Sequence, residues 1–428
     1  FFEYFCEKIV SFRGFELFIA RRLKLGRAAN TGNQGMNIAL TGVLLAVVVM
    51  ILSITIVMGF KDEVTEKIYQ LDPHIKITNA VLGIDDNYAT INGMEVREAL
   101  QGNQLLEKVK SMSLIADKPA ILKTDDEFKG VEYRGVDKGF DWTYIESRLV
   151  EGRVPNFADR ENVSEVVVSR TLARALKLKT GDKVLTYFID NKVKVRNSVI
   201  VGVFCTDFET FDNTIILGNI ALIQQVNGWN SATGNYMGVN MKDTKNVTAD
   251  SYTLFSILAL SCYERHNATL CNVSHTRDNN VAFFSWLSML DMNVAVILVL
   301  MLIVSGFTLV SALLMIILER IRMIGTFKAL GCDNNSVRRI FIYLTHKLIF
   351  RALLYGNAIG IGLALIQKYF HIIKLNPEVY YMPYVPISIN VLTLVLLNVG
   401  VVVASYLTLL GPSYVVSTIK PAATMRFD

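Results

Sequence analysis

The residue types best suited to metal or redox chemistry gather between positions 262 and 275. Cys262, His266, Cys271 and His275 follow the pattern C-x3-H-x4-C-x3-H, and thiolates and imidazoles are ligands that zinc binds in proteins. The spacing matches no common zinc module, and the segment is predicted to change from helix to strand midway. Three interpretations stay open: structural side chains, a Cys262–Cys271 disulfide favoured by an oxidising exterior, or a metal site. We assign no metal.

Motifs for nucleotide or hydrolytic chemistry are absent from the sequence. The chain has no G-x-x-x-x-G-K-[ST] loop to hold nucleotide phosphates, no H-E-x-x-H helix and no G-x-S-x-G elbow. Its five histidines leave few candidates for a base beside a nucleophile. We therefore predict that the chain is not an enzyme and that it holds no cofactor of its own.

The main feature of the sequence is instead a set of long segments that contain no charged residue. Asp, Glu, Lys and Arg are absent from three runs, 28–60, 292–318 and 379–419. A helix of about 20 apolar residues crosses a hydrocarbon core about 30 Å thick, so each run can hold one span. A fourth run contains Lys347 and Arg351, whose charged ends can reach the lipid interface. We expect spans at 38–60, 289–318, 336–366 and 389–411.

The distribution of charge orients these spans. Bases outnumber acids in residues 1–37 and 289–428, whereas acids outnumber bases in residues 61–288. Because short cytoplasmic loops are rich in Lys and Arg, we expect both termini and the loop between spans two and three in the cytoplasm. Residues 61–288 then lie outside. The net charge of +5 follows from this topology, so we expect contact with membrane lipid and no nucleic-acid partner.

The predicted fold is an α-helical membrane protein with four transmembrane helices and an α/β external domain between spans one and two. Alternating apolar residues predict strands such as Glu165–Ser169 and Tyr236–Met241, and a β-rich unit at about 145–230 inserted into an α/β unit. Apolar stripes beyond span one and before span two predict that both helices continue out of the membrane. The remaining segments are an amphipathic amino-terminal helix in 1–37, a loop at 367–388 and a tail at 412–428.

The segment 319–335, between spans two and three, is predicted to contain a short amphipathic helix. Ile321, Ile324 and Phe327 share one face, basic residues occupy another, and Gly331 supplies a C-cap. A segment that only connects two spans needs no such helix. An apolar face beside basic residues suits docking into a groove of a cytosolic partner.

Together these segments resemble the lipoprotein-releasing ABC transporter permeases, within the wider superfamily of macrolide-exporter and cell-division permeases. The resemblance covers essentially the whole chain. It rests on five segments: Glu16–Arg22, Met58–Phe60, Arg322–Gly331, Leu375–Tyr381 and Ile419–Phe427.

The resemblance implies a permease subunit of a bacterial inner membrane, with the external domain in the periplasm. It implies a second permease subunit, identical or paralogous, and a dimer of cytosolic ABC ATPases that bind ATP and Mg. Closure of the ATPases would reach the periplasmic domain through the helical extensions, which is called mechanotransmission. The substrate would be an acylated lipoprotein, taken from the outer leaflet and passed to a periplasmic lipoprotein carrier.

The resemblance also implies two groups of site residues. Coupling to the ATPase is expected at Arg320, Arg322, Ile324, Gly325, Phe327, Lys328 and Gly331. Contact with acyl chains is expected near the outer ends of spans one and two, at Met58, Phe60, Trp286, Leu287 and Met292.

Two other functions share this architecture. A cell-division-type permease regulates periplasmic wall hydrolases and moves no substrate. Its external domain is much smaller than residues 61–288, which favours transport here. A macrolide- or peptide-exporter-type permease is the other alternative.

Overall fold

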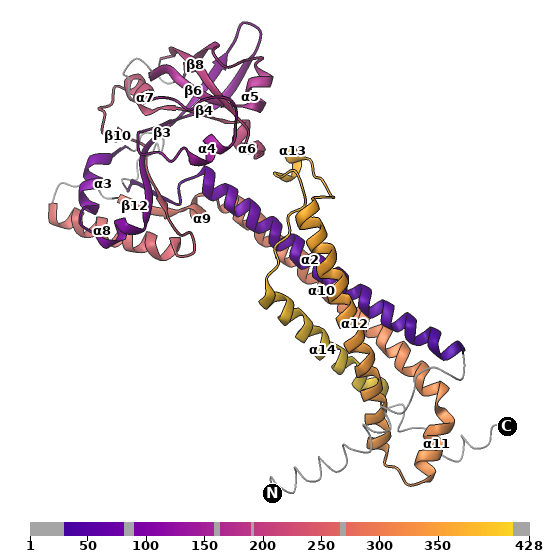
Figure 1. Ribbon diagram of the computed structural model, residues 1–428. Coiled ribbons are helices and arrows are strands. Elements are labelled where there is room, and N and C mark those ends of the chain that lie inside the picture. Colours follow the sequence, from indigo (N-terminus) through magenta and orange to yellow (C-terminus); the bar gives the residue numbers. More distant parts are fainter. Residues whose placement is uncertain (1–29, 81–89, 158–162, 190–191, 266–270, 414–428) are drawn as a thin grey trace. The chain divides into compact units, whose positions relative to one another are not determined.

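Four long helices carry the charge-free runs of the sequence (Figure 1). The computed structural model describes residues 30–80, 90–157, 163–189, 192–265 and 271–413. The amphipathic helix predicted within 1–37 and most of the tail at 412–428 lie outside the described residues. The four helices are α2 (Asn30–Leu71), α10 (Val281–Glu319), α12 (Asn334–Phe370) and α14 (Val391–Ser413). Each is long and apolar enough to cross a membrane, which confirms the prediction of four spans.

The helices of the first two spans are much longer than a bilayer requires. The 39 residues of α10 extend for about 58 Å at 1.5 Å per residue, whereas a hydrocarbon core is about 30 Å thick. α2 continues to Leu71 and stops just before Pro73, as a proline disfavours helix in the residue that precedes it. The predicted helical extensions are therefore confirmed.

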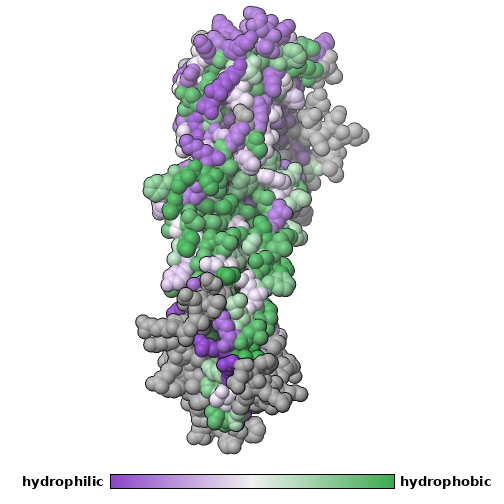
Figure 2. Space-filling view, turned by 90° about the vertical axis from the view of Figure 1, so that its right-hand side faces the viewer, coloured by the Kyte–Doolittle hydropathy of each residue, from purple (hydrophilic) through white to green (hydrophobic). Residues whose placement is uncertain are grey.

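The chain divides into two compact units, which we call the membrane unit and the external unit. The membrane unit comprises residues 1–62, 286–373 and 385–428, and the external unit comprises residues 63–285 and 374–384. Figure 2 shows one face of the molecule, with hydrophobic side chains gathered over the helices and hydrophilic ones over the strand-rich part.

Glycines bring α2 close to its neighbours inside the membrane unit. A Cβ added to Gly356 or Gly360 of α12 would lie 3.0 or 3.1 Å from side chains of α2. A Cβ added to Gly42 of α2 would lie 2.7 Å from Thr308 of α10. The helices thus pack at a distance that only small residues permit, as is common between spans.

A polar pair joins α12 to α14 within the same unit. Asn357 Nδ2 donates to Asn398 Oδ1 at 2.6 Å, and Asn398 Nδ2 donates to Asn357 Oδ1 at 2.9 Å. Each amide also donates to a carbonyl of its own helix. The pair therefore satisfies its polar atoms without water.

The external unit is built on one sheet with the strand order β12-β1-β11-β3-β4-β9-β6-β8-β5, and β7 lies beside both β3 and β8. The strands are β1 (Ile75–Asn79), β3 (Val109–Lys123), β4 (Phe128–Val136), β5 (Leu149–Gly152), β6 (Glu165–Ser169), β7 (Lys183–Phe188), β8 (Lys194–Phe204), β9 (Ile215–Asn219), β11 (Tyr236–Met241) and β12 (Cys271–His275). A separate ladder joins β2 (Ile91–Asn92) to β10 (Thr233–Gly234). The strands predicted at Glu165–Ser169 and Tyr236–Met241 are confirmed.

The shorter helices are α3 (Gly93–Leu100), α4 (Thr143–Ser147), α5 (Arg170–Ala175), α6 (Glu209–Asp212), α7 (Ile220–Asn227), α8 (Val247–Arg265), α9 (Thr276–Asn279), α11 (Ile321–Ala329) and α13 (Pro377–Tyr380), with a 3₁₀ turn at Gln104–Lys108. α3 and α8 contact each other, α3 also contacts β11, and α8 also contacts β12. Both strands pair antiparallel with β1, which lies between them. This α/β layer contains the first and last strands of the unit.

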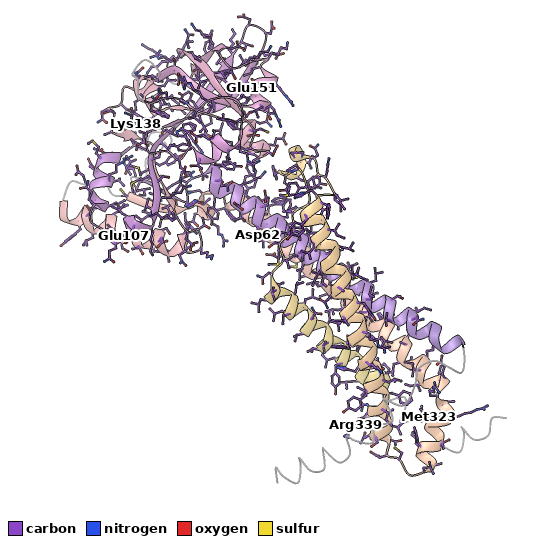
Figure 3. All side chains as sticks on the ribbon, in the orientation of Figure 1. Asp62, Glu107, Lys138, Glu151, Met323 and Arg339 are labelled. Carbon is purple, nitrogen blue, oxygen red and sulfur yellow. The ribbon has the colours of Figure 1, made fainter. Side chains whose placement is uncertain are left out.

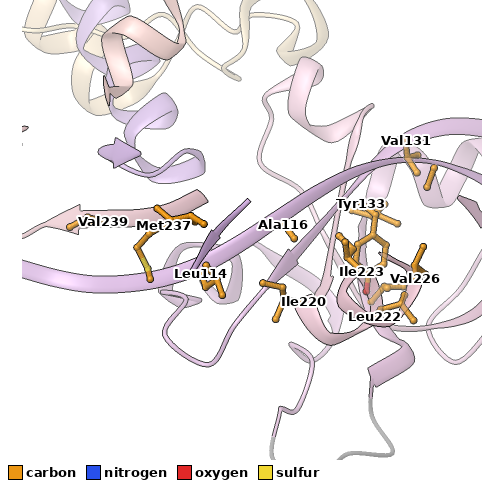
Figure 4. Packing of buried hydrophobic residues seen from close by; sticks show 14 of the residues in the cluster. Leu114, Ala116, Val131, Tyr133, Ile220, Leu222, Ile223, Val226, Met237 and Val239 are labelled. Atoms are coloured by element: carbon orange, nitrogen blue, oxygen red, sulfur yellow. The ribbon is translucent and has the colours of Figure 1, made fainter. Parts of the chain in front are cut away.

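The other half of the sheet closes into a barrel. Pairing runs from β3 through β4, β9, β6, β8 and β7 and back to β3. Tyr133 and Phe188 are fully buried inside it, with ring centroids 5.7 Å apart. Figure 4 shows Tyr133 beside Ile223 of α7, and α7 approaches β4 closely because a Cβ on Gly135 would lie 2.8 Å from Ile220 Cα.

The barrel begins earlier in the chain than the sequence indicated. The β-rich unit was expected at about 145–230, but two of the strands that close the barrel, β3 and β4, precede residue 145. The reason is the length of β3, whose first half pairs with β11 and whose second half pairs with β7. One strand therefore serves both halves of the unit.

Candidate coupling helix, substrate-contact residues and outer junction

The helix α11 lies in the segment predicted to couple to an ATPase, and it ends at the predicted cap. Gly331 has a φ of +90°. Its N–H donates to Lys328 O at 3.1 Å, and the N–H of Cys332 donates to Phe327 O at 2.9 Å. These two bonds form a Schellman C-cap, in which the left-handed residue is usually glycine.

The apolar face of α11 is turned toward its own chain. Ile324 is fully buried, Gly325 is buried, and Phe327 packs half-buried against the aliphatic core of the membrane unit. These side chains hold α11 in place. Because the core of this chain already covers Ile324, this side chain offers no exposed surface, and its role in coupling stays a prediction.

A different set of α11 residues is exposed. Arg322, Thr326 and Ala329 face outward, and Leu330 exposes 79% of its surface. Lys328 is half-buried, and Arg320 occupies the N-cap position of the helix. Figure 3 labels Met323 on this helix and Arg339 on α12. The surface that α11 offers is thus a ridge at its carboxyl end.

The predicted acyl-contact residues have different surroundings. Phe60 and Trp286 pack edge to face, with ring centroids 5.7 Å apart. Met292 is 68% exposed, Met58 is partly buried, and Leu287 is only 2% exposed. The structure therefore joins Phe60 to Trp286 and leaves Met292 on the surface, but it gives Leu287 little surface to offer a ligand.

Sequence reasoning missed a close contact beside Phe60. A Cβ added to Gly59 would lie 2.7 Å from the carbonyl carbon and oxygen of Pro386. Near it, the N–H of Ser388 donates to Thr55 O at 3.1 Å. The end of span one thus packs directly on the backbone that leads into span four, which explains the glycine in the Met58–Phe60 segment.

A buried lysine forms a junction in the external unit that the sequence did not reveal. Lys67, on the extension of α2, is 4% exposed. Its Nζ donates to Tyr381 O at 2.6 Å and to Thr206 O at 3.2 Å. One ammonium group therefore ties α2 both to the barrel and to the outer loop between spans three and four. We call this site the outer junction.

Three aromatic rings surround the outer junction. Phe208 lies 5.0 Å from Tyr381 and 5.5 Å from Phe283, measured between ring centroids. Tyr381 has a φ of +61°, a left-handed conformation that costs a non-glycine residue free energy. The rings come from the barrel, the outer loop and the start of α10, so the junction joins four segments of the chain.

A buried carboxyl lies on the same barrel loop. Asp212 is 3% exposed and accepts hydrogen bonds from the N–H of Thr206 at 3.1 Å and from its Oγ1 at 2.7 Å. Burial raises the pKa of Asp212 to about 6, against the effect of these two bonds. The carboxyl thereby orders the residue whose carbonyl receives Lys67.

The cysteine and histidine cluster is only partly described. Cys262 and Cys271 are present as thiols, and burial, followed by the nearby Cys262, raises the pKa of Cys271 to about 11. His275 pairs with Asp278, and His266 lies outside the described residues. No three ligand-type side chains gather among the residues that the structure describes. The disulfide stays a prediction, which thiol labelling without reductant can test.

An apolar groove runs between α10 and α14 in the membrane unit. Its volume is about 350 Å³, and its walls are Val299, Leu302, Ile303, Gly306, Phe307, Val310, Ala404 and Thr408. Gly306 and Ala404 leave room for it, since neither carries a bulky side chain. The groove has the lining that a hydrocarbon chain requires.

Two hairpins of the barrel expose apolar side chains to water. The residues are Phe128 at 75%, Leu185 at 39%, Ile189 at 59%, Val193 at 60% and Val195 at 40%. They are neighbours in the sheet, because Lys123 of β3 pairs with both Phe128 and Leu185, and Tyr187 pairs with Val195. We name these five residues the hairpin patch. Apolar surface of this kind commonly marks a binding site.

Known families match both parts of the chain. The family described as MacB-like periplasmic core domain matches residues 37–251, half of the chain. The family described as FtsX-like permease C-terminal matches residues 295–421. The first match contains most of the external unit, and the second contains α11, α12 and α14.

Relatives match the chain nearly from end to end. The "Lipoprotein-releasing system transmembrane protein LolC" of Neisseria meningitidis is 22% identical over 91% of this chain and 94% of its own length. The LolE protein of Haemophilus influenzae is 23% identical over 90% of this chain and 92% of its own. The crystal structure of the periplasmic region of MacB from Actinobacillus actinomycetemcomitans is 15% identical, covers 49% of this chain and 91% of that one, and has a TM-score of 0.35. This chain belongs to the MacB/FtsX superfamily of permeases and, within it, to the LolC/LolE type.

Proposed function

We propose that the chain is the permease subunit of an ABC transporter that extracts acylated lipoproteins from the outer leaflet of the inner membrane. The observation that carries the proposal is the match, over 91% of the chain, to a protein named for lipoprotein release. Exposing buried hydrocarbon to water costs about 0.8 kcal/mol per CH₂. Spontaneous release of an acyl chain is therefore negligible, and the process needs a source of free energy.

That source would be a separate dimer of cytosolic ATPases, which bind ATP and Mg. The sequence itself contains no phosphate-binding loop. The ridge of α11 supports docking of the ATPase at Arg322, Thr326, Ala329 and Leu330, since these side chains are exposed while Ile324 is buried. The coupling surface would thus lie on the helix that the sequence indicated, on the opposite face.

The α11 ridge can be tested with a matched pair of substitutions. Leu330→Asp places a charge on an exposed position that the fold does not need, so it should abolish co-purification of the ATPase while the permease elutes normally. An Asp at another exposed apolar position, such as Leu363 within a span, would be a poor control because the charge would hinder insertion into the membrane. Leu330→Ala is therefore the better control and should retain part of the ATPase. Full retention by Leu330→Asp would refute the docking surface.

Mechanotransmission is supported by continuous helices. α2 and α10 each contain a span and an extension that belongs to the external unit. The outer junction adds a third route, because Tyr381 lies in the loop that connects α12 to α14. A displacement of any of these helices would act on the barrel through Thr206 and Phe208.

Acyl chains would contact the outer ends of spans one and two, where Phe60 and Trp286 form an aromatic pair and Met292 is exposed. The groove between α10 and α14 offers further hydrocarbon surface. The hairpin patch would receive the periplasmic lipoprotein carrier, since a carrier of acyl chains itself needs an apolar surface. A second permease, identical or paralogous, would complete the pathway, and both termini would lie in the cytoplasm.

Depletion of the protein in its host tests the proposed function. Mature lipoproteins destined for the outer membrane should accumulate in the inner membrane, as measured by fractionation and lipoprotein immunoblots. A plasmid copy of the wild-type chain should restore sorting, whereas the Leu330→Asp chain should not. Normal sorting after depletion, with altered wall-hydrolase activity, would instead favour the cell-division type of function.

A further inference from the structure

Two basic side chains on one face of α12, Lys347 and Arg351, have no acidic partner in the part of the chain that the structure describes. The helix, Asn334–Phe370, contains no Asp or Glu. Its bases include Arg339, Lys347 and Arg351, and all three are exposed. Lys347 and Arg351 are four residues apart, so they share a face of the helix. Among the described residues, neither makes a hydrogen bond or an ion pair.

The same face continues as exposed apolar surface beyond these charges, toward the carboxyl end of the helix. Phe350 exposes 67% of its surface, Leu354 58% and Tyr355 53%. They follow Lys347 and Arg351 by three or four residues, so they continue the face toward the charge-free part of the helix. Such a surface, basic at one level and aromatic or aliphatic at the next, matches the boundary between lipid headgroups and acyl chains.

The length of the helix places the charges at that boundary. Residues 352–367 contain no Asp, Glu, Lys or Arg, and they extend for about 24 Å at 1.5 Å per residue. A hydrocarbon core is about 30 Å thick, so long side chains at either end of this stretch reach the headgroups. In the proposed topology α10 crosses from the periplasm to the cytoplasm, so the end of α12 with Lys347 and Arg351 would lie at the cytoplasmic leaflet.

We propose that Lys347 and Arg351 bind the phosphate of an anionic phospholipid of the cytoplasmic leaflet, whose acyl chains lie along Phe350, Leu354 and Tyr355. A guanidinium and an ammonium one turn apart suit an oxygen-rich headgroup. A cytosolic protein is the less favoured partner, because exposed hydrocarbon continues directly from the charges along the span. The proposal does not depend on the identity of the transported substrate.

The test is retention of lipid by the intact transporter complex in nanodiscs of phosphatidylglycerol and phosphatidylethanolamine, read by native mass spectrometry. The wild type should retain phosphatidylglycerol preferentially. Each charge near an anionic surface contributes about fivefold in binding, so Lys347→Gln with Arg351→Gln should weaken retention about 25-fold. Lys368→Gln removes an exposed base from the other end of the same helix and should leave retention unchanged.

A charge-preserving exchange guards against a folding defect. Lys347→Arg with Arg351→Lys should retain phosphatidylglycerol, and all variants should be compared at equal elution volume and thermal midpoint. The proposal is overturned if the double Gln variant retains as much phosphatidylglycerol as Lys368→Gln. It is also overturned if the double Gln variant loses the ATPase while its lipid retention is unchanged, since the face would then serve a cytosolic partner.

Discussion

The two units of this chain differ in whether they bury charged side chains. Every charged residue that is buried among the described residues belongs to the external unit, including Lys67, Arg134, Glu165 and Asp212. In the membrane unit the buried polar residues are all neutral: Thr55, Ser305, Ser336, Thr345, Gln367 and Ser405. Its bases at 347 and 351 remain on the surface of α12.

This difference follows from the surroundings of each unit, because water and a bilayer impose different costs on a buried polar or charged group. In the external unit a charge can be buried when hydrogen bonds replace those lost to water, as Arg134 does with two bonds to Asp117 at 3.0 and 3.1 Å. Within a bilayer an unreplaced bond is costlier, so close packing at glycines and neutral pairs such as Asn357–Asn398 take that role.

The largest effect is expected where a buried charge loses its partner. Replacing Arg134 with Met leaves the Asp117 carboxylate, whose side chain is only 18% exposed, with Tyr236 Oη as its one remaining side-chain donor, at 2.9 Å. The free energy of unfolding of the external unit should fall by about 3–5 kcal/mol, measured by denaturant unfolding of the purified chain.

The control for Arg134→Met removes both charges. Arg134→Met combined with Asp117→Leu should recover much of the loss, since a well-packed apolar pair can replace a buried ion pair at little cost. A loss below about 1 kcal/mol for the single variant would place this pair with weak surface ion pairs and would weaken the contrast between the units.

An intermediate effect is expected from close packing in the membrane unit. Gly59→Ala places a methyl group 2.7 Å from the backbone of Pro386, and overpacking of this kind typically costs about 1–3 kcal/mol. Gly362→Ala is the matched control, because its added Cβ meets no atom within 4 Å. It should be neutral or stabilising by up to about 1 kcal/mol. Thermal unfolding in detergent compares the two, and equal midpoints would contradict the packing account.

The smallest effect is expected from the polar pair between α12 and α14. A double-mutant cycle with Asn357→Leu and Asn398→Leu should give a coupling energy of about 0.6 kcal/mol, and at most about 1.7 kcal/mol. Steric trapping or unfolding in mixed micelles supplies the measurement. A coupling as large as the Arg134 effect would mean that the membrane unit relies on polar contacts as strongly as the external unit does.

The fold was predictable where its signals are local. A charge-free run is a property of consecutive residues, so the spans emerged directly, as did strands with alternating apolar residues such as Glu165–Ser169. The extent of the barrel was not predictable from the sequence. It depends on the long strand β3, which pairs with β11, β4 and β7 at different points along its length. Pairing between distant segments leaves no mark within any one of them.

Features of the candidate sites were likewise predictable only where their signals are local. The cap at Gly331 was predictable, since a helix end needs a left-handed residue nearby. The direction of Ile324 was not, because an apolar helix face can be covered either by a partner or by the chain's own core. Lys67 gave no signal, since it binds main-chain carbonyls 139 and 314 residues away in sequence.

Reconstituted release is the most direct test of the proposed function. The complex would be placed in proteoliposomes with a labelled acylated lipoprotein, a soluble carrier outside and ATP supplied to the ATPase. The account predicts ATP-dependent transfer of the lipoprotein to the carrier, and its loss with Leu330→Asp. Vigorous ATP hydrolysis by a complete complex that transfers no lipoprotein would contradict it.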